Sequence, residues 1–121
     1  MNKKKSSEDL VQQVLKVLDY IAVKEGLKPP GIYGVILVED IPRGKSVVKL
    51  NGETAISDNV LIVKRVDDLT RLVVRIAYGY FTLTLLPIAG PQAASLARRL
   101  VKEKTWEIMV ILSQYVSRKG D

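Results

Sequence analysis

The spacing of apolar residues changes twice along this chain, and these changes limit its fold more than any other feature. Between residues 10 and 22, apolar residues recur every three or four positions, which is typical of an amphipathic helix. From residue 32 to residue 86 they form β-branched runs and alternations, which are typical of strands. After Gly90–Pro91, helical spacing returns and continues towards Lys119. The order helix, sheet, helix predicts an α+β domain.

Turn sequences divide the middle of the chain into candidate strands. Asn51–Gly52 is a two-residue hairpin signal, and Asp67–Asp68 is a second turn. The alternation changes phase at Gly79, so the last candidate is either a hairpin or one long strand with a bulge. We predict an antiparallel sheet of four to five strands between an N-terminal helix and a long C-terminal helical region. The candidate strands are 32–38, 46–50, 53–56, 60–66 and 71–86.

The length of the chain predicts one domain. At 121 residues and 13.5 kDa, with no linker or repeat, we expect a flexible basic tail at 1–5 and a single domain at 6–121. Lys104–Thr105 interrupts the apolar stripe of the C-terminal region, which is therefore either one helix or two. No apolar run approaches the roughly 20 residues that a membrane span needs, and no signal-peptide pattern opens the chain. We therefore expect a cytoplasmic protein without a membrane span.

The absence of two residue types excludes most catalytic chemistry. The chain has 0 Cys and 0 His, which excludes thiolate nucleophiles, imidazole bases, disulfides and the usual ligands of zinc, haem and iron–sulfur clusters. The adjacent carboxylates Glu39–Asp40 point to opposite faces of a strand, and Asp67–Asp68 suits a turn for backbone reasons alone. We expect no enzyme activity, no metal and no cofactor.

The charge of the chain favours a polyanionic partner. Its net charge is +6, from 19 Lys and Arg against 13 Asp and Glu, and its pI is near 9.6. Such a balance is typical of proteins that bind nucleic acid or an acidic membrane surface. The many aliphatic residues and the lack of Cys are also typical of thermophile proteins, in which lysine-rich surfaces need no such partner.

The predicted sheet carries the first candidate binding site. If the terminal helices cover one face, basic and aromatic residues share the other, where cations bind phosphates and rings stack on unpaired bases. The same residue types also suit a solvated sheet face. We favour a non-catalytic protein that binds single-stranded DNA or RNA with little sequence preference. The candidate residues are Lys49, Arg71, Arg75, Tyr33 and Tyr80, with Lys64 and Arg65 at the rim.

The C-terminal helical region carries two further hypotheses. Arg98, Arg99 and Lys102 form a second basic patch, which is either a phosphate site or an ordinary solvated helix face. The run that follows is apolar almost all round the helix, so it either fills the core or pairs with a second subunit. The residues of this predicted self-association are Trp106, Ile108, Met109, Leu112 and Tyr115.

One family resemblance supplies an alternative function. Residues 60–99 (VLIVKRVDDLTRLVVRIAYGYFTLTLLPIAGPQAASLARR) resemble the last three strands and final helix of roadblock-type domains, and residues 31–38 are similar to their first strand. Those domains place a helix between their second and third strands, where residues 50–60 leave no room for one. The resemblance implies a dimeric roadblock- or longin-like interaction module that regulates a protein partner such as a small GTPase.

Overall fold

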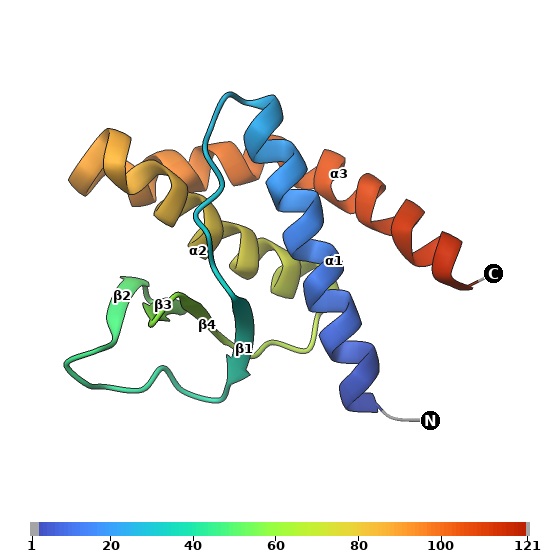
Figure 1. Cartoon of the computed structure of the whole chain (residues 1–121), viewed down its shortest axis with the longest axis horizontal. Helices are drawn as coiled ribbons and strands as arrows, with labels where there is room; N and C mark the ends of the chain where they lie inside the picture. Colours follow the sequence, from blue (N-terminus) through green and yellow to red (C-terminus); the bar gives the residue numbers. More distant parts are fainter. Residues whose placement is uncertain (1–2, 121) are drawn as a thin grey trace.

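The computed structural model describes the backbone of residues 3–120 and the side chains of residues 9–115 (Figure 1). It is an α+β fold with an N-terminal helix, a four-stranded sheet and a long C-terminal helix, which confirms the predicted class. Helix α1 begins at Lys3, inside the predicted tail. The elements are α1 Lys3–Lys24, β1 Gly34–Val38, β2 Val48–Asn51, β3 Thr54–Ser57, β4 Val60–Lys64, α2 Leu69–Ala89, the 3₁₀ turn η1 Gly90–Gln92 and α3 Ala93–Gly120.

The sheet is mixed, which corrects the prediction of a purely antiparallel one. Its order is β1-β4-β3-β2; β1 runs parallel to β4, and the other pairs are antiparallel. The chain leaves β1 at one edge and enters β2 at the opposite edge, so the meander of β2, β3 and β4 returns beside β1 in the same direction. The hairpin predicted at Asn51–Gly52 is present, with Gly52–Glu53 joining β2 to β3, and Asp58–Asn59 joins β3 to β4. Asp58 and Asn59 have φ values of 50° and 64°, as a tight two-residue hairpin requires.

The largest correction concerns residues 71–86, which were expected to form strands and instead form the middle of helix α2. The helix begins at a local signal, because the Asp68 side chain accepts a 2.9 Å hydrogen bond from the Arg71 backbone N–H. Gly79 does not mark a change of strand. A Cβ there would lie 2.8 Å from Leu61 Cδ1 and 3.3 Å from Thr54 Cβ, so Gly79 permits the close approach of α2 to the sheet.

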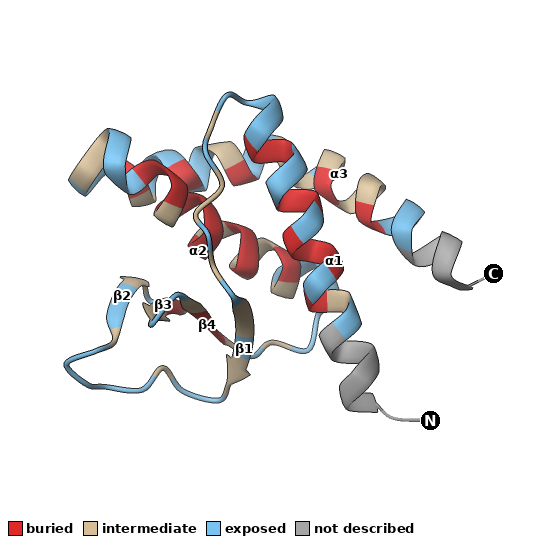
Figure 2. Ribbon diagram, in the orientation of Figure 1, coloured by how far each residue is buried: buried red, intermediate tan, exposed pale blue. Residues whose placement is uncertain are grey.

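Helix α2 lies at the centre of the molecule, and this position explains why its pattern resembled a strand. It packs on β4 and β3 as well as on α1 and α3, so apolar residues occupy nearly all its faces and alternation appears by coincidence (Figure 2). Thr82 and Thr84 suit this interior because their hydroxyls donate to the carbonyls of Tyr78 and Tyr80, one helical turn back. The fold that the roadblock resemblance implies for residues 60–99 is therefore not observed, since one strand and two helices replace three strands and a helix.

The apolar character of α2 also bears on the membrane prediction. The helical stretch Leu69–Tyr115 contains an 18-residue window with a mean hydropathy of 1.6, which suffices by length and composition to cross a membrane. Half of that window is buried inside the protein, as in the core helix of a soluble protein. The stretch is compatible both with a core helix of a soluble protein and with a membrane span, so the absence of a membrane span stays a prediction.

Helix α3 continues through Lys104–Thr105, so the C-terminal region is one helix along its described length. Ion pairs tie its middle to the end of α1. Lys24 Nζ lies 2.7 Å from Glu107 Oε2, and Lys104 Nζ lies 3.1 Å from Glu25 Oε2 and 3.8 Å from Glu107 Oε1. The positive charge on this side of α3 is thereby neutralised within the fold.

This network predicts a pH dependence of stability. The hydrogen bond from Lys24 and its positive charge hold the pKa of Glu107 below its ordinary value of 4.5. The same hydrogen bond and the negative charge of Glu107 raise the pKa of Lys24 above its ordinary value of 10.5. The stabilisation is therefore complete between pH 4.5 and pH 10.5. It is lost as the pH falls through the folded pKa of Glu107 and as the pH rises through the folded pKa of Lys24. Glu107→Gln should lower the free energy of unfolding at neutral pH. In acid, the free energies of unfolding of the variant and of wild type should become equal. Urea unfolding at several pH values checks this, with exposed Glu103→Gln as the control that should match wild type throughout.

Candidate nucleic-acid interface

The structure does not bring the predicted sheet-face residues together. Tyr33 comes just before β1 and is 80% exposed, whereas Lys49 lies on β2 at the opposite edge of the sheet. Three strand spacings, about 14 Å, separate these two edges. Arg71, Arg75 and Tyr80 are not on the sheet at all, since they belong to α2. The basic and aromatic sheet face expected from the sequence therefore does not exist in this fold.

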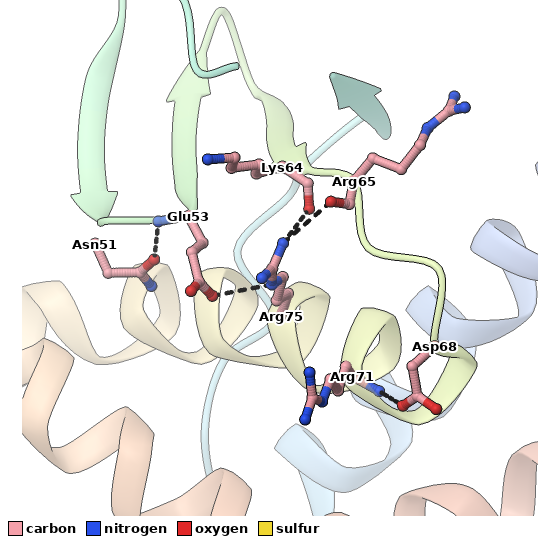
Figure 3. A network of polar contacts seen from close by, with 7 residues as sticks. All are labelled: Asn51, Glu53, Lys64, Arg65, Asp68, Arg71 and Arg75. Atoms are coloured by element: carbon pink, nitrogen blue, oxygen red, sulfur yellow. Dashed lines mark hydrogen bonds and ion pairs between the residues drawn. The ribbon is translucent and has the colours of Figure 1, made fainter. Parts of the chain in front are cut away.

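Arg75 makes polar contacts between α2 and the sheet region (Figure 3). Its Nη1 donates to the backbone carbonyl of Lys64 at 2.8 Å and to that of Arg65 at 3.3 Å, while its Nε lies 3.0 Å from Glu53 Oε2. These contacts join α2 to the end of β4 and to the start of β3. Because a carboxylate neutralises the guanidinium and its Nη1 and Nε donors are used within the fold, Arg75 is a poor candidate for binding a phosphate.

The other cations near Arg75 are more exposed but do not form one cluster. In Figure 3 the guanidinium groups of Arg65 and Arg71 point away from each other. Lys64 is half exposed, and its Nζ lies 4.0 Å from Asp40 Oδ1. These residues line the rim of the sheet and the start of α2 without converging on one ligand.

Tyr80 is a core residue rather than a stacking platform. Its side chain is 0% exposed, its ring meets that of Phe81 edge to face at 5.0 Å, and its hydroxyl donates a 2.5 Å hydrogen bond to Asp19 Oδ1. Burial, reinforced by the Asp19 carboxylate, raises the pKa of Tyr80 far above its ordinary value, so the phenol stays protonated. A base cannot stack on this ring unless the core opens.

The three residues of the second predicted basic patch lie together on the surface of α3, and an exposed tryptophan lies beside them. Arg98, Arg99 and Lys102 are all exposed on α3, and Trp106, one turn beyond Lys102, is 78% exposed. Positions three and four residues apart lie on one helix surface, so these four side chains share a side of α3. The opposite side is buried through Ala97, Val101, Ile108 and their neighbours. We refer to Arg98, Arg99, Lys102 and Trp106 as the basic–aromatic face of α3.

Arg98 is held in place at one end of this face. Its guanidinium carbon lies 5.6 Å from the centre of the Tyr78 ring, a cation–π contact between α3 and α2. The pair borders a hollow of about 450 Å³ whose other walls are the β2–β3 turn at Asn51, Gly52 and Glu53 and the α3 residues Ala94 and Ser95. Arg98 thus stands beside a depression with both polar and apolar walls.

The electrostatics of the basic–aromatic face differ from those of Lys104 on the same helix. Lys104 has two carboxylate partners, whereas no carboxylate among residues 9–115 lies within ion-pair distance of Arg98, Arg99 or Lys102. Unpaired cations on one helix face create a positive local potential that attracts anions. Among the candidate basic residues predicted from the sequence, Arg98, Arg99 and Lys102 are the ones that lie together on one exposed surface.

The residues predicted for self-association divide between core and surface. Ile108 and Leu112 are each 2% exposed and fill the core, and Met109 packs partly against it. Trp106 stands in solvent, and Tyr115 is 37% exposed. The run after Trp106 therefore serves mainly to cover the core, and self-association stays a prediction. Sequence reasoning treated Trp106 apart from the basic patch, although its four-residue spacing from Lys102 was a usable signal.

No group of three or more His, Cys, Asp or Glu side chains that could hold a metal occurs in the part of the chain that the structure describes. No family model, curated protein or solved structure matches this chain.

Proposed function

We propose that this chain is a non-catalytic protein that binds single-stranded nucleic acid, with little sequence preference, through the basic–aromatic face of α3. The observation that carries the proposal is the placement of Arg98, Arg99 and Lys102 on the same exposed helix surface as Trp106. The lack of His and Cys supports a binding role rather than catalysis.

Each side chain has a separate task in this proposal. Arg99 and Lys102 bind phosphates, and Arg98, whose guanidinium is oriented by Tyr78, binds a third. Trp106 stacks on an unpaired base, a contact worth about 1–3 kcal/mol that every base can make. From Arg98 to Trp106 the face is about 12 Å long, at 1.5 Å per helical residue. The backbone contacts and the stacking both tolerate sequence change, so little base preference is expected.

Fluorescence anisotropy with a labelled oligothymidylate at two salt concentrations tests the proposal. Arg99→Glu/Lys102→Glu should weaken binding at least tenfold at low salt, and removing two phosphate contacts should flatten the logarithmic salt dependence by about 1.4. Trp106→Ala should weaken binding by about 1–3 kcal/mol and leave the salt dependence unchanged. The charge-reversal variant tests the contacts to phosphates, and Trp106→Ala tests the stacking on bases.

The matched control is Arg43→Glu/Lys45→Glu, which changes the net charge equally at two exposed positions of the loop between β1 and β2. It should bind nearly as wild type does. Equal weakening by both charge reversals would show that net charge alone attracts the oligonucleotide. No binding at low salt would reject the proposed function altogether.

A further inference from the structure

The connection between α2 and α3 forms an exposed apolar tip. Leu86 is 42% exposed, Ile88 69% and Leu96 37%, and two exposed prolines lie among them. We define the tip as Leu86, Pro87, Ile88, Pro91 and Leu96. Figure 1 shows this connection at the opposite end of the molecule from both chain termini. All five side chains are exposed, Leu86 and Leu96 only in part.

The tip lacks the charges that usually surround an exposed helix end. There is no Asp, Glu, Lys or Arg from residue 76 to residue 97, and the flanking charged residues in the sequence are Arg75, which is paired inside the fold, and Arg98. Exposed apolar residues in a stretch without charges are typical of surfaces that become buried against a protein partner or a membrane. The tip lies at one end of the molecule, a position that would allow its side chains to enter the acyl region of a lipid bilayer.

Backbone N–H donors of the tip are paired or absent at four positions, which lowers the cost of removing the tip from water. Gly90 N–H donates to the Leu86 carbonyl, and Ala93 N–H donates to the Gly90 carbonyl through the turn η1. Pro87 and Pro91 carry no N–H at all. A helical hairpin closed in this way presents few unpaired donors to an apolar environment.

Cations follow the tip at a suitable distance. Arg98 comes eight residues, or about 12 Å, after the turn at Gly90, and it lies two residues beyond Leu96 at the base of the tip; Arg99 and Lys102 come next. Interfacial helices enter a bilayer to a depth of about 5–10 Å, so cations at this distance reach the lipid phosphates when the tip is inserted. Two such tips would bring these cations together with like charge, which disfavours a second copy as the occupant.

We propose that the apolar tip of the α2–α3 hairpin inserts into the surface of an anionic membrane, while Arg98, Arg99 and Lys102 bind lipid phosphates. This property goes beyond nucleic-acid binding and needs no membrane span. The tip supplies a contact that an oligonucleotide does not use, so substitutions there separate the two ligands.

Flotation with vesicles tests the proposal. Wild type should float with vesicles of mixed phosphatidylcholine and phosphatidylglycerol but not with phosphatidylcholine alone. Ile88→Asp should reduce the bound fraction at least tenfold, whereas Val23→Asp, an equally exposed apolar position on α1, should not. The melting temperatures of both variants should equal that of wild type. Failure to bind anionic vesicles, or equal binding by Ile88→Asp, would overturn the proposal.

A second measurement reports insertion directly. In a Trp106→Phe background, Ile88→Trp places the single tryptophan of the chain at the tip. Its emission should shift to shorter wavelength on addition of anionic vesicles and be quenched by brominated acyl chains. Binding without this shift or quenching would mean adsorption through the cations alone, and would reject insertion.

Discussion

Phe81→Ala is expected to lower the free energy of unfolding by about 3–5 kcal/mol. Phe81 is 0% exposed and lies on the central helix α2, where its ring meets that of Tyr80 with the two planes at 75°. Truncation removes the apolar surface that the ring buries, and it leaves a cavity that elements packed on several sides of α2 cannot close. Since a domain of this size has a total stability of about 5–15 kcal/mol, this single change would remove a large share of it.

Denaturant unfolding followed by circular dichroism measures this loss. Trp106→Ala is the matched control, because it also truncates an aromatic side chain, but one that is 78% exposed. Its effect on stability should stay within about 0.5 kcal/mol. Phe81→Leu keeps most of the volume and should show a smaller loss if the alanine variant does not fold. A change below 1 kcal/mol for Phe81→Ala would contradict the position of α2 in the core.

The second large effect concerns Arg75, for which sequence and structure assign different roles. Arg75→Ala should lower the free energy of unfolding by about 2–3 kcal/mol, because it leaves two carbonyls and the Glu53 carboxylate without their partner. It should leave the affinity for an oligonucleotide unchanged wherever the variant is folded. A binding role in the sheet region would produce the opposite result, with weaker binding and little change in stability.

Arg71→Ala is the control for Arg75→Ala. It removes an exposed guanidinium from the same helix, one turn away, and retains the backbone N–H that Asp68 caps. Its stability should match that of wild type. Both variants are measured by urea unfolding and by anisotropy with the same oligonucleotide. Equal stability of the two variants would disprove the structural role of Arg75.

The sequence predicted the candidate site only in part. It identified Arg98, Arg99 and Lys102 as a shared helix surface, because residues three and four apart are neighbours in any helix. It favoured Arg75 and Tyr80 for binding because their assignment to a strand placed them on a solvent face. That assignment failed because α2 is packed on most sides, and a helix that is apolar all round carries no clear period.

The sequence by itself determined those features whose causes lie within a few residues. The spacing in α1, the hairpin after Asn51 and the absence of thiol and imidazole chemistry belong to this group. Tertiary structure alone decided that α2 is a helix, that β4 lies parallel to β1, that Arg75 is paired and that Trp106 is exposed. Burial and ion pairing depend on contacts between residues far apart in the chain. Local conformational preference is too weak to specify such contacts without the surrounding fold.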